Sequence, residues 1–243
     1  MIAGGSNWEN GEKEILSEIH QYDVSSSRWR CVGKLPHPCA YPLVATSSGN
    51  TTTKRRTHII GGMNNDSTLD KVLEVGVDKQ VREIAWTLPS PLTFSAGAFW
   101  GDDLVLLGGT PDFTDLSKAT NEVLSVETKS GKTSKLGNIP GGPFFLAASA
   151  QTNHGFYIFG GATFANEKVE NVSSAFSYDI ESNKWQAVSP YPIRSRGIAA
   201  AILDDNRIYL AGGYASERDG FCDDAYIYNP SEDRYEETVP LPY

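Results

Sequence analysis

One short pattern recurs five times along this chain of 243 residues: a run of apolar residues closed by two glycines. The successive glycine pairs are 57, 47, 52 and 52 residues apart. A sequence period near 50 residues is typical of β-propellers, in which each repeat builds one radial sheet. Because a repeat of this kind buries its apolar faces only against its neighbours, the period constrains the whole fold. The second glycines of the pairs are Gly5, Gly62, Gly109, Gly161 and Gly213.

Each repeat continues with the same features in the same order. An aromatic–Asx pair follows the glycines, as in "YDIESNKW" (178–185), then a tryptophan or a substitute, and an apolar residue followed by proline closes the repeat. The third repeat has degenerated, with Thr133 at the tryptophan position. Alternating strands separated by turn residues predict four antiparallel strands per repeat, of which the glycine pair ends the second. In three repeats the tryptophan lies 24 residues after the second glycine, at Trp29, Trp86 and Trp185.

This combination of a glycine pair, Tyr-Asp, Trp and Leu-Pro resembles the kelch repeat, and the resemblance covers the whole chain. It implies an all-β fold, a kelch-type β-propeller of four-stranded antiparallel blades. We predict a single domain, 1–243, with 19 strands. Because an unclosed ring leaves strand edges unpaired, part of a six-bladed ring is favoured over a five-bladed ring that lacks one strand. The predicted units are a three-strand partial blade at 1–35 and full blades at 37–88, 90–139, 141–190 and 193–240.

A narrower resemblance is carried by "MIAGGSNWENGE", "GKLPHPCAYPLVAT", "LPSPLTFSAGAFWGDDLVLLGGT" and "AQTNHGFYIFGGATF". These segments are similar to the kelch-type N-acetylneuraminate epimerases, or sialic acid mutarotases, and most of all to their circularly permuted branch. The resemblance implies cofactor-free interconversion of sugar anomers by acid–base ring opening. The stretch G-E-x-x-P-G-x-R-T, which holds that family's proposed catalytic acid and arginine, has no match in the chain. No catalytic residue is therefore assigned, and whether the chain is an enzyme stays open.

The long polar loops between the second and third strands predict which face is functional, because binding residues concentrate on loops of a rigid scaffold. The segment 9–19 is predicted as such a loop followed by a strand. Loops after the closing proline emerge on the same face. Five residues past that proline lie Tyr41, Phe94, Phe145 and, in the last blade, Gly197. This counting predicts three equivalent aromatic rings near the mouth of the central channel, either as a platform for a sugar or as packing between blades.

Two arginines and an Asn-aromatic step complete the predicted site. Arg194 and Arg196 precede the rim position of the last blade, and a guanidinium group suits a carboxylate ligand, although bonding to loop carbonyls is the alternative. The step Asn7-Trp8 resembles one in the mutarotase-like family, and a loop anchor is the alternative role of Trp8. We predict an acidic sugar, sialic acid, as the ligand; the alternative function is a non-catalytic kelch module that binds a protein partner on the loop face. The predicted ligand-binding residues are Asn7, Trp8, Tyr41, Phe94, Phe145, Arg194 and Arg196.

Composition excludes several other classes. A net charge of -9 and a pI near 4.9 argue against nucleic acid or an anionic membrane as a partner. The four histidines and three cysteines show no metal-ligand spacing, so we expect neither a metal nor a cofactor. The sequence shows no signal peptide and no apolar run near 18 residues, and an odd number of cysteines indicates reduced thiols. These features predict a cytoplasmic protein.

Overall fold

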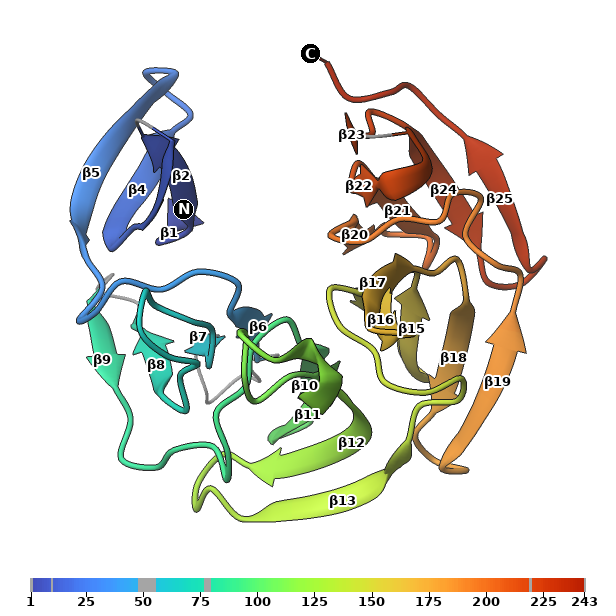
Figure 1. Ribbon diagram of the computed structural model, residues 1–243, viewed down its shortest axis with the longest axis horizontal. Helices are drawn as coiled ribbons and strands as arrows, with labels where there is room; N and C mark the ends of the chain where they lie inside the picture. The colour runs from blue at the N-terminus through green and yellow to red at the C-terminus, as the bar shows by residue number, and fades with distance from the viewer. Residues whose placement is uncertain (1, 10, 48–55, 77–79, 219, 243) are drawn as a thin grey trace.

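The fold was analysed in a computed structural model that describes residues 2–9, 11–47, 56–76, 80–218 and 220–242. This part of the chain contains 25 β-strands and two 3-10 helices of three residues, η1 (Leu116–Lys118) and η2 (Ser216–Arg218). Five antiparallel sheets stand around a central axis as the blades of a β-propeller, with an opening between the first and the last (Figure 1). The prediction of an all-β propeller is confirmed. In the described residues, no helix has the length and apolar content needed to cross a membrane.

Nineteen of the strands form blades, which are numbered 1 to 5 in chain order. Blade 1 contains β1 (Ile2–Ala3), β4 (Glu18–Asp23) and β5 (Arg28–Lys34). Blade 2 contains β6 (Leu43–Thr46), β7 (Thr57–Ile60), β8 (Val72–Val75) and β9 (Val81–Glu83). Blade 3 contains β10 (Ala96–Trp100), β11 (Asp103–Gly109), β12 (Thr120–Glu127) and β13 (Thr133–Asn138). Blade 4 contains β14 (Ala148–Gln151), β15 (Gly155–Phe159), β18 (Ala175–Asp179) and β19 (Lys184–Val188). Blade 5 contains β20 (Ala199–Ile202), β21 (Ile208–Ala211), β24 (Ala225–Asn229) and β25 (Arg234–Glu237).

The remaining six strands pair as three hairpins within segments that were predicted to be loops, and in these segments the prediction was wrong. The turn between β16 and β17 places Asn166 and Glu167 at φ values of 51° and 60°. Two successive positive φ angles make the primed turn whose twist matches a β-hairpin, so the segment pairs with itself. In 9–19 the strand Glu12–Ile15 forms where a loop was expected, although the blade strand that follows it, Glu18–Asp23, was predicted correctly. The hairpins are β2 (Ser6–Glu9) with β3 (Glu12–Ile15), β16 (Ala162–Ala165) with β17 (Lys168–Asn171), and β22 (Tyr214–Ala215) with β23 (Gly220–Phe221).

The glycine pairs join each blade to the next. Gly61 has a φ of +61°, and a methyl group on it would lie 2.0 Å from the carbonyl oxygen of Leu92 in blade 3. The N–H of Gly62 donates to that same oxygen at 2.8 Å. Only glycine permits this close approach together with the left-handed backbone. The same donation from a second glycine recurs from Gly5 to Cys39, from Gly109 to Phe144 and from Gly161 to Ser195.

The two blades beside the opening in Figure 1 each present a face that has no neighbouring blade. Tyr178 of blade 4 is 2% exposed, whereas the equivalent Tyr22 of blade 1 is 40% exposed and its contact Trp29 is 51% exposed. Ala148 on the inner strand of blade 4 is buried, whereas the equivalent Ala199 of blade 5 is exposed. Tyr22, Trp29 and Ala199 are exposed, whereas the equivalent residues of inner blades are buried against a neighbouring blade. This difference fits a partial ring.

Trp86 does not occupy the tryptophan position that its spacing predicted. Val81 lies there, because it pairs with Val75 as Trp185 pairs with Tyr178 in blade 4. The Trp86 side chain instead reaches blade 3, where Nε1 donates to the carbonyl oxygen of Thr128 at 2.6 Å. The third repeat has no tryptophan at this position. Trp86, which belongs to the second repeat, packs against a buried cluster that includes Leu104, Leu106 and Val126 of blade 3.

Tyr191 links blades 4 and 5 through an aromatic cluster with Tyr226 and Tyr235. It is 2% exposed, and burial raises the pKa of its phenol well above the usual range. Its hydroxyl has no hydrogen-bond partner among the described residues. We therefore expect Tyr191→Phe to keep the ring contacts and to raise the free energy of unfolding by about 1 kcal/mol, because a buried hydroxyl without a partner is costly.

Urea unfolding of the two proteins measures this difference. The matched control is Tyr178→Phe, because the buried Tyr178 hydroxyl forms a 2.6 Å hydrogen bond with Asn183 Oδ1. That variant is expected to lose about 1 kcal/mol. Equal losses in both variants would contradict the assignment of the Tyr191 hydroxyl as unsatisfied.

Candidate functional site

An arc of four residues, here called the rim, borders the mouth of the central channel. They precede the inner strands of blades 2 to 5 and have φ values of 53° (Tyr41), 58° (Phe94), 55° (Leu146) and 68° (Gly197). Successive rim residues are bonded through the backbone: Phe94 N–H to Tyr41 C=O at 3.4 Å, Leu146 to Phe94 at 2.9 Å, and Gly197 to Leu146 at 2.8 Å. Large side chains are uncommon in this left-handed conformation, and such strained residues often mark functional sites.

Phe145 is not a rim residue, so its predicted equivalence with Tyr41 and Phe94 was wrong by one position. It bridges to Ala162 as Thr93 bridges to Thr110, which places it one residue before the rim. It is 2% exposed and packs between blades, its alternative role. The loop "PGGPFF" has one more residue between the closing proline and the rim than the corresponding loops have. Leu146 consequently occupies the rim of blade 4.

At one end of the rim, the hairpin β2–β3 of blade 1 contacts Tyr41. Lys13 Nζ donates to the Tyr41 hydroxyl at 3.2 Å and also lies 4.6 Å from the centre of its ring. Ser6 Oγ lies 3.5 Å from the same hydroxyl, and the ring of Phe94 meets that of Tyr41 edge-on at 5.1 Å. Burial alone raises the pKa of Tyr41, but the hydrogen bonds from Ser6 and Lys13 and the Lys13 charge outweigh it, so the pKa is lowered. A phenol held by an ammonium group suits proton transfer.

The same hairpin places the two residues of the Asn7-Trp8 step on opposite faces. Trp8 lies directly opposite Lys13, so both belong to the face that contacts Tyr41. Asn7 lies opposite Glu14 and belongs to the other face. Trp8 is 72% exposed, which leaves its ring available to a ligand or a partner. The structure therefore brings Trp8, and not Asn7, to the side of the hairpin that borders the mouth.

At the other end of the rim, Arg196 is held in a fixed orientation. Its guanidinium group donates to Asn171 Oδ1 at 2.6 Å and stacks over the ring of Tyr214 at 4.5 Å. Asn171 is 6% exposed and is itself fixed, since Nδ2 donates to the Tyr214 carbonyl oxygen at 2.8 Å. Among the described residues, no carboxylate forms an ion pair with Arg196. An oriented guanidinium group with donors to spare suits a bidentate carboxylate.

Arg194 lies beside Arg196 but is differently occupied. Its Nε donates to the Asn171 carbonyl oxygen at 3.2 Å and lies 3.7 Å from Glu217 Oε1. These contacts favour the alternative prediction for Arg194, in which the arginine bonds a loop carbonyl group and does not bind a ligand. Sequence reasoning missed Asn171, which touches both arginines. It also missed Lys13, whose position depends on the unexpected hairpin.

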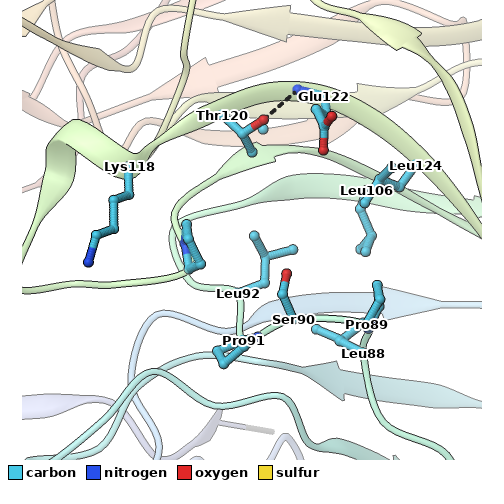
Figure 2. Close-up of a pocket in the computed structure, with 12 residues that line it drawn as sticks. Leu88, Pro89, Ser90, Pro91, Leu92, Leu106, Lys118, Thr120, Glu122 and Leu124 are labelled. Carbon is cyan, nitrogen blue, oxygen red and sulfur yellow. Dashed lines mark hydrogen bonds between the residues drawn. The ribbon is translucent and has the colours of Figure 1, made fainter.

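A separate pocket of about 140 Å³ lies at the junction of blades 2 and 3 (Figure 2). Leu88 and Leu124 line it where the junction of blades 4 and 5 has Tyr191 and Tyr226, whose rings contact each other. The smaller side chains leave the space unfilled. Lys118 and Glu122, which also line it, are paired with Asp112 at 2.8 Å and Lys135 at 2.6 Å, respectively. We interpret the pocket as a consequence of the degenerate third repeat and not as part of the mouth.

In residues 2–9, 11–47, 56–76, 80–218 and 220–242, no group of three or more histidine, cysteine or acidic side chains is arranged to hold a metal ion. Cys31 is exposed, Cys39 and Cys222 are buried, and all three are free. Burial raises the pKa of the Cys39 thiol to about 11. The chemistry available at the mouth is therefore that of Lys13, Tyr41 and Arg196.

Comparison with known proteins supports the assignment of the repeats. The Kelch motif profile matches residues 199–242. The solved structure of YjhT superimposes with a TM-score of 0.77 at 13% identity, covering 98% of this chain and 80% of that one. Together with the five sheets and their glycine pairs, these matches show a β-propeller whose last blade carries a Kelch motif.

Three curated proteins illustrate the range of relatives that the chain resembles. The chain is 30% identical over 134 residues to the N-acetylneuraminate epimerase of Pasteurella multocida (strain Pm70), a match that covers 54% of this chain and 33% of the epimerase. It is 26% identical over 164 residues to alpha-scruin of Limulus polyphemus, covering 63% of this chain and 17% of that protein. It is 23% identical to Kelch-like protein 25 of Xenopus tropicalis, covering 100% of this chain and 39% of that protein. The chain thus spans less than half the length of each of these relatives.

Proposed function

We propose that the channel mouth binds an acidic sugar of the sialic acid type, with Arg196 holding the carboxylate. The observation that carries the proposal is the guanidinium group itself, which Asn171 and Tyr214 orient at the rim and which has no carboxylate partner among the described residues. A charged hydrogen bond of this kind contributes about 1.5–3 kcal/mol. The similarity to an N-acetylneuraminate epimerase supports this class of ligand.

The aromatic rings of Tyr41 and Phe94 on the rim suit the apolar face of such a sugar. Tyr41 is 39% exposed and Phe94 is half-buried beside it, so an aromatic surface lies on the arc between the two cations. Lys13 and Arg196, one at each end, supply local positive charge in a chain whose net charge is -9. We expect the apolar face of the sugar to pack on these rings while its carboxylate is bound by Arg196.

Titration with N-acetylneuraminate, followed by ligand-observed NMR and calorimetry, tests the proposal. We expect Arg196→Met to weaken binding at least about tenfold, because one charged contact is lost. The matched control is Arg194→Met, which removes an arginine already paired with Glu217 and should change the affinity less than about threefold. The methyl ester of the sugar, which lacks the carboxylate charge, should bind wild type as weakly as the acid binds Arg196→Met. Absence of binding to wild type, or equal affinities for wild type and Arg196→Met, would overturn the proposal.

The second candidate is a protein-interaction module on the same loop face. Two hairpins present exposed rings there, Trp8 at 72% and Phe221 at 79% exposure. Two of the relatives are named as kelch proteins, Kelch repeat and BTB domain-containing protein 12 of Danio rerio and Kelch-like protein 25 of Xenopus tropicalis. A Trp8→Ser variant separates the candidates, because Trp8 lies on the blade 1 hairpin, away from the Asn171 and Tyr214 contacts that orient Arg196. A protein partner should lose affinity for this variant, whereas the Arg196 contact to a sugar should remain.

A further inference from the structure

We propose that the pocket between blades 2 and 3 receives one aromatic side chain of a partner protein, and that basic residues flank this side chain in the partner. The pocket lies on the loop face, because one of its walls is the connection 88–92 between these blades and another is the loop that follows β11 (Figure 2). No residue of the rim lines the pocket, so the proposal does not depend on the binding of a sugar.

Three equivalent positions recur at the junctions between neighbouring blades. The first is the apolar residue before the closing proline. The second is the residue whose carbonyl oxygen accepts the N–H of the second glycine, and the third lies on the third strand of the next blade. These positions hold Leu88, Leu92 and Leu124 between blades 2 and 3, Ile139, Phe144 and Phe176 between blades 3 and 4, and Tyr191, Ser195 and Tyr226 between blades 4 and 5.

Aromatic rings meet at the two later junctions. Phe144 contacts Phe176 edge-on with ring centres 6.1 Å apart, and Tyr191 contacts Tyr226 in the same way at 5.6 Å. None of the described residues that line the pocket carries an aromatic ring, and Leu92 is half-buried where Phe144 is 5% exposed. The pocket therefore lies where the other junctions have a pair of rings, and a ring supplied from outside would restore close packing there.

The size and the lining of the pocket suit a single ring. A cavity of about 150 Å³ lined by aliphatic side chains takes up benzene, and this pocket has a volume of about 140 Å³. Four leucines and three prolines are among the residues that line it, and their side chains offer no hydrogen bond. The pocket therefore favours an apolar ring over a polar group of the same size.

A free ring of this size is too small to be the complete ligand. A molecule with so few atoms reaches a Kd of only about 1 mM in a half-open pocket. A peptide adds contacts beside the pocket, where Pro89 and Ser90 of the connection are exposed. In that arrangement the ring is the anchor and the flanking residues of the partner supply the remaining affinity.

The charges around the pocket favour basic flanking residues. Lys118 at its edge is paired with Asp112 at 2.8 Å and with Asp115 at 3.5 Å, so two carboxylates exceed its positive charge. Glu122, which also lines the pocket, is paired with Lys135 at 2.6 Å. These three acids and two bases sum to -1, in a chain whose net charge is -9. Such a field attracts a basic segment and repels an acidic one.

Ligand-observed NMR with toluene, the side chain of phenylalanine, tests whether the pocket takes a ring. Wild type should bind toluene with a Kd of about 1 mM, and Leu124→Phe, which places a ring where Phe176 and Tyr226 lie, should weaken binding at least about tenfold. Ser90→Phe should have the same effect without a change in the core, because Ser90 is exposed and its hydroxyl group points toward the pocket (Figure 2). The matched control, Thr87→Phe, adds a ring at an exposed residue outside the pocket and should bind toluene as wild type does.

Three short peptides, acetylated and amidated at their ends, test the partner. The first has phenylalanine between two lysines, the second has alanine in place of the phenylalanine, and the third has glutamate in place of both lysines. The first should bind wild type at least about threefold more tightly than toluene does, and at least about tenfold more tightly than the alanine peptide. At low salt the glutamate peptide should bind at least about threefold more weakly than the first. Ser90→Phe should reduce the affinity for the first peptide as it does for toluene.

Each part of the proposal can fail separately. Absence of toluene binding to wild type, or equal affinities of wild type and Ser90→Phe, would refute the ring pocket; near-ultraviolet circular dichroism checks that each variant is folded. If toluene binds but the phenylalanine peptide binds no more tightly than toluene, the occupant is a free aromatic molecule and the protein partner is refuted. Equal affinities for the lysine and glutamate peptides would refute the basic flanking residues.

Discussion

Gly61→Ala is expected to lower the free energy of unfolding by about 3 kcal/mol or more, and to prevent folding in a marginally stable background. Two costs combine at this residue. A left-handed backbone costs an L-residue about 1–2 kcal/mol, and the new methyl group would lie 2.0 Å from the carbonyl oxygen of Leu92. Neither atom moves freely, because that carbonyl also accepts the N–H of Gly62 across the blade junction.

Gly212→Ala is the matched control for this prediction. Gly212 is the equivalent first glycine of blade 5, with a φ of +70°, but its closest neighbour for a methyl group is the Leu241 side chain at 3.2 Å. Only the backbone cost of about 1–2 kcal/mol is expected there. Thermal and urea unfolding of both variants measure the difference. If the two substitutions prove equally costly, the glycine pair is required for its backbone conformation alone and not for contact with the next blade.

Trp86→Ala is expected to lower the free energy of unfolding by about 2–3 kcal/mol, which combines partial burial of an indole ring with a hydrogen bond worth about 1 kcal/mol. Its Nε1 donates to Thr128 at 2.6 Å, and its ring also lies against Gly131, so the substitution loosens the junction of blades 2 and 3.

Trp29→Ala, the same change at an indole that is 51% exposed, should cost less than about 1 kcal/mol. Trp86→Phe should retain part of the packing and lose the hydrogen bond, giving an intermediate value. Equal losses for Trp29→Ala and Trp86→Ala in urea unfolding would show that Trp86 does not support blade 3.

Much of the fold could be predicted because its signals are local. The glycine pairs recur with a period that only a few architectures have, and each blade strand carries its own alternation of apolar and polar residues. These features act within one repeat, so they determined the all-β class and the 19 blade strands. The hairpins escaped prediction because their polar sequences differ little from those of long loops, and turn geometry at residues such as Asn166 decides between the two.

The arrangement of the candidate site could not be predicted from the spacing of residues within one repeat. Spacing alone put Phe145 on the rim, but one additional loop residue moves Leu146 there, and only the pairing of Phe145 with Ala162 reveals it. Arg194 and Arg196 look alike in sequence, yet Glu217 pairs with the first.

By itself, the sequence determined the repeat, the strands of each blade and the candidate residues on the loop face. The tertiary structure alone decided that Trp86 serves the next blade, that Lys13 reaches Tyr41, and that Asn171 orients Arg196. Each of these contacts joins residues of different blades, so it depends on how closely the blades approach and on which side chains fill the space between them. Such distances are properties of the assembled ring and are not encoded in the period of any one repeat.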